Sequence, residues 1–143
     1  MERSIEALKN SMIDWAMGFL GRQEYAGWCL SFIEDALEQP NEIEIFGGDS
    51  AKESFLLYRD VLRTGIPERG GFVFYDCLCH TPEGLMDRGH CGIALADGKV
   101  IHAWDRVRID GYRDIEQLSA FGEHPDYLGR ALLERVLAQK PDR

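Results

Sequence analysis

The stretch GHCGIALADGKVIHAW, residues 89–104, holds two histidines twelve positions apart, His90 and His102. Its two halves are short and rich in apolar residues, as strands are, and Ala96-Asp97-Gly98 between them is typical of a hairpin turn. Such a hairpin brings the two histidines to matching ends of neighbouring strands. Histidines paired in this way indicate either a metal site or a proton-transfer site.

Alternation along the first of these strands favours proton transfer. It places His90, Gly92 and Ala94 on one face, and this face leaves room for a helix terminus to approach. His102 on the next strand comes within reach of a hydrogen bond to His90. A catalytic base needs such a partner, because the partner fixes which ring nitrogen carries the proton.

The rest of the chain predicts helices first and strands after them. The predicted helices cover 3–20, about 28–38, a segment beginning at Asp49 or Ser50, 114–121 and 125–139; the predicted strands cover 71–78, 90–95, 99–104 and part of 105–112; 80–89 is predicted as a loop. This order predicts an α+β fold with N-terminal helices packed on an antiparallel sheet and a C-terminal helix. Neither a repeat nor a linker is present, so residues 1–143 are expected to form a single domain.

Composition excludes several classes of function. With 25 acidic and 16 basic residues the net charge is −9, which argues against a nucleic-acid-binding face. The apolar runs are too short to cross a bilayer, so no membrane partner is expected. The N-terminus lacks the features of a signal peptide. We therefore expect a chain that is cytoplasmic as synthesised, exported by a non-classical route, or cut from a longer protein, with its four cysteines reduced.

Cys29 follows a glycine-containing turn and stands at the start of the second predicted helix. Unpaired N–H groups and the helix dipole stabilise a thiolate there, which lowers the pKa of the thiol and makes it a nucleophile. The same N–H groups can hold an oxyanion during acyl transfer. A buried core cysteine is the alternative interpretation.

Three aromatic residues lie near the predicted site in sequence. Tyr25 is a candidate oxyanion donor or cleft residue, and Trp28 and Trp104 are candidate walls of a substrate cleft, although each also suits a packed core. Asp105 is a second candidate for orienting a histidine, with a solvated hairpin end as the alternative.

Zinc is the competing interpretation of the same region. It offers five zinc-type ligands within fifteen residues, namely Cys77, Cys79, His80, His90 and Cys91. The spacing Cys-x-Cys-His differs from the usual Cys-x-x-Cys knuckle, and alternation puts His90 and Cys91 on opposite faces. We therefore predict no metal and no cofactor, and assign the other cysteines as core or loop thiols.

In order and spacing, the chain resembles the NlpC-type cell-wall cysteine peptidases and the related CHAP amidases, a papain-like superfamily. The resemblance spans about residues 12–130 and rests on a set of segments: WAMGFLGRQEYAGWCLSFIEDAL, PERGGFVFYDC, HCGIAL, VIHAW and YLGRALLE. The loop from Tyr25 to Cys29 is shorter than in the family, Trp28 replaces an aspartate, and Gly71 stands where a strand-leading aspartate is usual. These departures indicate a remodelled substrate pocket.

The resemblance implies a thiol hydrolase with Cys29 as nucleophile, His90 as general base and His102 as the third polar residue. The implied substrate is a peptidoglycan stem or cross-link peptide, or a related γ-glutamyl or D-amino-acid peptide; an inhibitor or immunity protein and a delivery machinery are further expected partners. An acyltransferase or deamidase on the same residues is the alternative enzyme. The non-enzymatic alternative is a silent, zinc-stabilised interaction domain.

Overall fold

The computed structural model describes residues 4–45, 47–119 and 123–138, without the side chains of 79–81. The predicted α+β fold is confirmed. The helices are α1 (Ile5–Met17), α2 (Cys29–Asn41), α3 (Ala51–Tyr58) and α4 (Leu133–Ala138). The strands are β1 (Phe72–Asp76), β2 (Leu78–Thr81), β3 (Gly84–Asp87), β4 (His90–Ala94), β5 (Lys99–Ala103), β6 (Val107–Gly111) and β7 (Asp126–Ala131).

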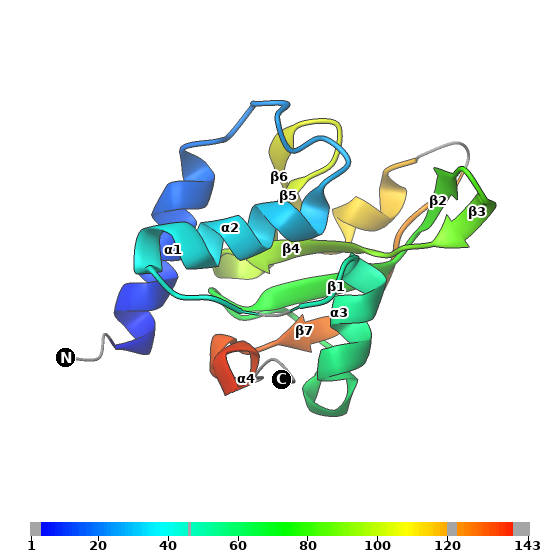
Figure 1. The fold of residues 1–143 in the computed structure, drawn as a ribbon. Coiled ribbons are helices and arrows are strands. Elements are labelled where there is room, and N and C mark those ends of the chain that lie inside the picture. Colours follow the sequence, from blue (N-terminus) through cyan, green and yellow to red (C-terminus); the bar gives the residue numbers. More distant parts are fainter. Residues whose placement is uncertain (1–3, 46, 120–122, 139–143) are drawn as a thin grey trace.

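An antiparallel sheet of order β6-β5-β4-β1-β7 forms the centre of the molecule, and α1 and α2 lie across one of its faces (Figure 1). The main core fills the space between this face and the helices; it includes Phe32 and Ile33 of α2 and Ile93 of β4. A smaller core on the opposite face includes Ala94 and Val100. Side chains of β4 therefore alternate between the two cores, as predicted from the sequence.

The hairpin of β4 and β5 forms as its turn signal predicts. Ile93 pairs with Ile101 and Ala94 with Val100, and Asp97 and Gly98 in the turn both have positive φ. Aspartate and glycine tolerate that conformation better than most residues. Gly92 has a packing role instead, because a Cβ there would lie 2.9 Å from the Cβ of His102. Because glycine has no side chain, His102 fits at its position on the neighbouring strand.

Residues 80–89 were predicted as a loop, and that prediction is wrong. Strands β2 and β3 form a two-stranded sheet of their own, with its turn at Pro82-Glu83 and Gly84 at a φ of 107°. Lys52 of α3 bonds to Asp76 at 2.7 Å and to Asp87 at 3.1 Å, and so ties the base of this hairpin to the helix. These charged residues are far apart in the sequence, so local propensity does not predict the ion pairs that support this hairpin.

The predicted helix over 125–139 is also wrong for most of its length. Residues 126–131 form β7, which pairs with β1. Of the described residues in this range, only 133–138 are helical, and position 139 lies outside the described residues. The pairing shifts register between Phe74 and Tyr75, and Gly129 has a φ of 150° there, which suits a bulge. Pairing with β1 outweighs the helical spacing of the apolar residues. Within 114–121, Asp114–Gln117 is a 3₁₀ turn, and positions 120 and 121 lie outside the described residues.

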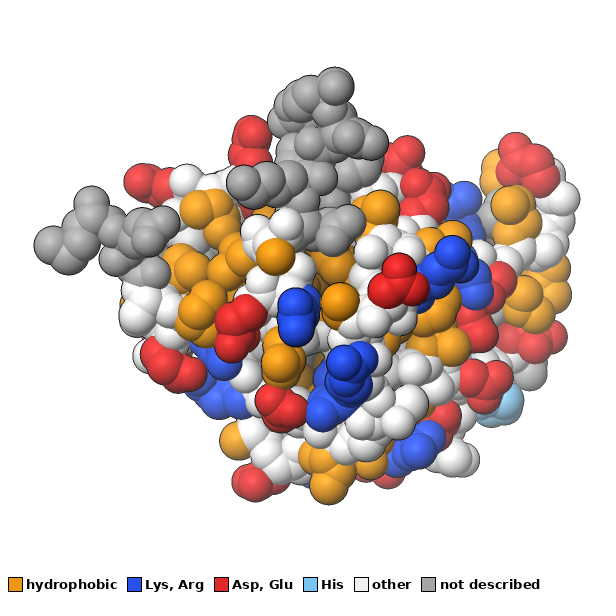
Figure 2. Space-filling model, turned by 90° about the horizontal axis from the view of Figure 1, so that it is seen from below, with side chains coloured by type: hydrophobic (Ala, Val, Ile, Leu, Met, Phe, Trp, Pro, Cys, Tyr) orange, Lys and Arg blue, Asp and Glu red, His pale blue; other side chains and the backbone are white. Residues whose placement is uncertain are grey.

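The three N-terminal helices lie close to their predicted positions. Ser50 caps α3 by accepting a hydrogen bond from the backbone of Glu53. Helix α2 runs to Asn41, further than predicted. Pro40 lies inside its last turn, and Glu42 ends the helix in the left-handed conformation. In the described ranges, every helix is too short or too polar to cross a membrane. Figure 2 shows one face of the molecule, on which basic and acidic side chains are interspersed.

Candidate active site

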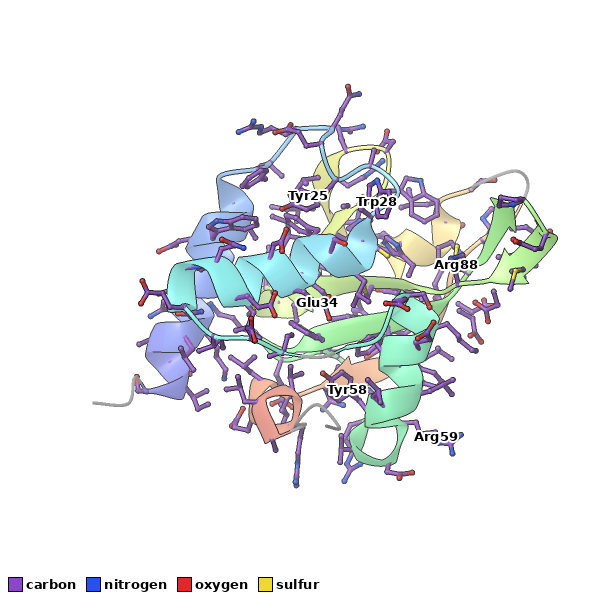
Figure 3. All side chains as sticks on the ribbon, viewed as in Figure 1. Tyr25, Trp28, Glu34, Tyr58, Arg59 and Arg88 are labelled. Carbon is purple, nitrogen blue, oxygen red and sulfur yellow. The ribbon has the colours of Figure 1, made fainter. Side chains whose placement is uncertain are left out.

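A cleft of about 1140 Å³ opens at the N-terminal end of α2. One side carries Trp28 and Cys29, and the strand ends supply His90 and Trp104. The start of α3 and the β2–β3 hairpin complete the lining, and Arg88 leads into β4 from that side (Figure 3). The cleft thus joins the predicted nucleophile and base to segments that are far apart in sequence.

Cys29 is the first residue of α2, as predicted. Gly27 has a φ of 80°, which favours glycine, and its N–H donates to the carbonyl of Trp104 at 3.4 Å. This bond holds the turn before α2 against the end of β5. The N-cap residue Trp28 makes no side-chain capping bond, so the N–H groups of the first turn keep their capacity to bind an acceptor.

The surroundings of Cys29 favour its thiolate. The pKa of the Cys29 thiol is lowered well below its ordinary value, first by a hydrogen bond from the thiol of Cys91 and then by the hydrogen bond and charge of His90. Burial opposes these effects without outweighing them. The pKa of Cys91 is raised instead, because that side chain is buried and lies beside the Cys29 charge. Cys29 is therefore the more acidic thiol of the pair, and its thiolate is the one that these surroundings favour.

The two histidines are in direct contact. The Nε2 atom of His90 lies 2.8 Å from Nδ1 of His102, and Nε2 of His102 lies 2.7 Å from Oδ2 of Asp110. Both imidazoles are buried. The structure thus brings together Cys29, His90 and His102, and adds Asp110 as a fourth member.

Charge assigns the protons in this series. The pKa of Asp110 is lowered to about 2, first by the hydrogen bond from His102, so it is a carboxylate and can only accept. Burial lowers the pKa of His102 to about 4, and its imidazole is neutral near pH 7. His102 therefore donates from Nε2 and accepts at Nδ1, and His90 donates from Nε2. This leaves Nδ1 of His90 to exchange a proton with Cys29.

Sequence reasoning missed Asp110. In the observed register of β5 and β6, His102 lies opposite Arg108 and Val100 opposite Asp110, which puts the carboxylate diagonally across from the imidazole. Arg108 donates to the same Oδ2 atom at 2.8 Å. The alternation in residues 105–112 indicates which of their side chains share a face. It does not indicate the register in which this strand pairs with β5. Asp105, the sequence candidate for orienting a histidine, pairs instead with Arg106 and Arg108.

The structure does not bring Tyr25 into the cleft. Its hydroxyl donates to Asp35 of α2 at 2.5 Å, and its ring packs on Phe19 and Phe32. Tyr25 is not among the residues that line the cleft, because its side chain turns toward Asp35 and Phe32 of α2. This geometry gives no support to the hypothesis that Tyr25 binds an oxyanion. The first turn of α2, which has no side-chain cap, lines the cleft instead.

Both tryptophans line the cleft, as the sequence suggested. Trp28 is 66% exposed, which is unusual for so large an apolar side chain and suits contact with a ligand. Trp104 packs edge-on against the ring of His90, with their centroids 5.0 Å apart. Trp104 thereby restricts the rotation of the imidazole and shields it from water.

The structure describes the side chains of three of the five candidate zinc ligands. Among the side chains that are described, no group of three or more His, Cys, Asp or Glu residues is arranged to hold a metal ion. Cys79 and His80, two of the five candidate ligands, lie outside those side chains. Of the remaining three, His90 bonds to His102 and Cys91 faces Cys29. None of Cys29, Cys77 and Cys91 is in a disulfide.

Burial of neutral His102 makes stability depend on pH. The unfolded imidazole, with its ordinary pKa of 6.5, binds a proton below that pH, whereas the folded one resists protonation down to about pH 4. The folded state therefore loses stability as pH falls through this window, on the order of 2 kcal/mol by pH 4.5. Glu34, whose pKa burial raises to about 7, acts in the opposite direction. Comparison with H102Q isolates the histidine.

Urea unfolding at pH 7.5 and pH 4.5 measures this effect. The stability of the wild type relative to H102Q is expected to fall at the lower pH. Equal changes in the two proteins would mean that His102 is not held neutral by the fold.

Two solved structures share this fold. RipD from Mycobacterium tuberculosis, described as a non-catalytic NlpC/p60 domain protein adapted to peptidoglycan binding, matches with a TM-score of 0.50 and 15% identity, over 92% of this chain and 100% of that one. RipA, a resuscitation promoting factor interacting protein mutated at one cysteine, matches with a TM-score of 0.52 and 14% identity, over 89% of this chain and 64% of that one. No protein-family model matches, and no curated protein sequence does. The predicted papain-like, NlpC-type architecture is thus confirmed at the level of fold.

Proposed function

We propose that the protein is a thiol hydrolase that cleaves amide bonds through an acyl-enzyme on Cys29. One observation carries the proposal: the hydrogen-bonded series Asp110, His102 and His90 ends beside a cysteine at the uncapped start of a helix. Nucleophile, base, orienting groups and oxyanion donors then meet in one cleft, which is the set of parts that acyl transfer requires.

Acylation follows from this arrangement. The Cys29 thiolate attacks the carbonyl carbon, and the electron pair of the C=O bond moves to the oxygen. N–H groups in the first turn of α2 hold this oxyanion. His90 carries the proton from the thiol on Nδ1 and gives it to the leaving nitrogen as the C–N bond breaks. The released amine leaves a thioester on Cys29.

Deacylation reverses the role of His90. The imidazole now takes a proton from water at Nδ1, and the resulting hydroxide attacks the thioester carbonyl. The thiolate departs and the acid is released. Throughout, Nδ1 of His102 accepts a hydrogen bond from the Nε2–H of His90. Asp110 keeps His102 in the tautomer that can accept this bond.

We propose peptidoglycan stem or cross-link peptides as the substrate class. The support is the shared fold with NlpC/p60 proteins, one of which is described as peptidoglycan-binding. The cleft extends from Cys29 along the β2–β3 hairpin to the start of α3, which gives room for several residues of a peptide. Transfer of the acyl group to an amine, or loss of ammonia from a side-chain amide, uses the same acyl-enzyme and remains the alternative chemistry.

A second candidate function is peptidoglycan binding without catalysis, because the fold relative RipD is described as non-catalytic. In this chain, Cys91 and His90 lower the pKa of Cys29, and His90 is bonded to His102, which is bonded to Asp110. That network favours the hydrolase.

Incubation with defined muropeptides tests the proposal, with mass spectrometry to identify the cut bond. Hydrolysis is expected to add one water across a single amide bond. A parallel reaction with glycinamide separates acyl transfer, which would instead produce the glycinamide adduct. Calorimetric binding of peptides that stay intact after long incubation would reject the hydrolase and favour the binding domain.

A further inference from the structure

Cys91 directly follows the proposed base in β4 and points to the face that α2 covers. It belongs to the main core together with Ile93 of the same strand and Ile33 of α2. Cys29 packs against this core from the first turn of α2. A helix start and a strand start thus bring two thiols close together, although the sequence predicts Cys91 only as a core or loop thiol.

The two thiols are neighbours and differ in access. Cys29 packs against the core cluster that contains Cys91, and Cys91 is the first of the groups that lower the pKa of Cys29. Cys29 is partly exposed in the cleft, whereas Cys91 has 0% exposure. Cys29 lines the cleft and Cys91 does not, so a reagent that enters the cleft meets Cys29 first.

Their protonation states also differ. Cys29 is the thiolate, and Cys91 stays a thiol because burial and the neighbouring negative charge raise its pKa. A thiolate is the form that reacts with peroxides. Once Cys29 becomes a neutral sulfenic acid, the part of the rise in the pKa of Cys91 that comes from the Cys29 charge is removed, while the larger part that comes from burial stays. The Cys91 thiol then loses its proton more readily, at the stage when Cys29 is a sulfenic acid with which it can react.

We propose that Cys29 and Cys91 form a redox-active pair, in which a hydroperoxide oxidises Cys29 and Cys91 closes a disulfide that reversibly blocks the nucleophile. In the first step the Cys29 thiolate attacks the peroxide oxygen; the S–O bond forms, the O–O bond breaks, and the leaving alkoxide takes a proton to become an alcohol, or water when the oxidant is hydrogen peroxide. In the second step the Cys91 sulfur attacks the sulfenic sulfur; the S–S bond forms, and the hydroxyl leaves as water with the Cys91 proton.

The balance is two electrons passed from the two thiols to one peroxide. A dithiol reverses it by thiol–disulfide exchange. Without Cys91, the sulfenic acid at Cys29 has no buried thiol beside it and proceeds to the sulfinic acid, which a dithiol does not reduce. The pair therefore protects the nucleophile as well as switching it off.

Mass spectrometry of the full chain tests this inference without relying on amide cleavage. Protein treated with hydrogen peroxide is expected to lose two hydrogens, to yield a Cys29–Cys91 cross-linked peptide after digestion, and to recover both thiols in dithiothreitol. C91V keeps a side chain of similar size and is expected to gain two oxygens at Cys29 that dithiothreitol does not remove. C77S, altered at another thiol of the same cleft, is expected to behave as the wild type.

Two results would overturn the pair. One is wild-type protein that gains oxygen at Cys29 without any cross-link. The other is a cross-link from Cys29 to Cys77 or Cys79. Thermal unfolding checks that C91V is folded, and the mapping of the wild type stands by itself if that variant is not. Since peptide masses report on sulfur alone, failure here is distinct from failure of the proposed hydrolase.

Discussion

Cys29→Ala is expected to reduce amide cleavage to the background rate, a loss of about 10⁴-fold or more. Alanine removes the sulfur that forms the acyl-enzyme, while His90, His102 and the first-turn N–H groups of α2 stay in place. Alanine also suits a helix start, so the fold is expected to remain. The measurement is the rate of product formation from the muropeptide that the wild type cuts.

Cys77→Ala is the matched control for this variant. Cys77 lines the same cleft but lies beside Leu78, with its sulfur 3.8 Å from that carbonyl. Its activity is expected to stay near that of the wild type. Iodoacetamide adds a second measurement, because the thiolate of Cys29 is expected to react first and the C29A protein to lose that fast phase. Full cleavage by C29A would end the acyl-enzyme mechanism.

Asp110→Asn is expected to lower kcat by about 10²- to 10⁴-fold with little change in KM. An asparagine matches the size of aspartate but offers an N–H donor as well as an acceptor. His102 is then free to carry its proton on Nδ1, where it opposes the Nε2 proton of His90. The base is left in the wrong tautomer although every side chain keeps its place.

Asp105→Asn is the matched control, since Asp105 also lines the cleft and also pairs with Arg108. It is expected to retain activity. A purely structural role for Asp110 would lower stability and leave the chemistry of the folded fraction unchanged. The alkylation rate of Cys29 against pH separates the two, because D110N is expected to need a higher pH for fast alkylation. Loss of activity in D105N with retention in D110N would return the orienting role to Asp105.

Much of the site could be predicted because its signals are local. The helix start at Cys29 follows from a glycine turn and an apolar helical pattern, and the pairing of His90 with His102 follows from alternation on either side of one short turn. Each of these follows from a pattern within one continuous stretch of the sequence. Local backbone preference is sufficient to place them.

The residues that the sequence did not place depend on contacts between separate elements, and no pattern within one segment specifies those contacts. Asp110 reaches His102 through the register of β5 and β6, which a one-residue slip would reverse. Tyr25 turns from the cleft because Asp35, ten positions along the chain, accepts its hydroxyl. Strand β7 exists because it completes the edge of the sheet beside β1.

By itself, the sequence therefore determined the α+β order of elements, the nucleophile at a helix start and the two histidines of one hairpin. Only the tertiary structure decided what surrounds them: the carboxylate behind His102, the second thiol beside Cys29 and the hairpin that borders the cleft. The physical reason is that periodicity fixes which face a side chain takes. The neighbours on that face are set by packing between elements, whose energies a single segment does not contain.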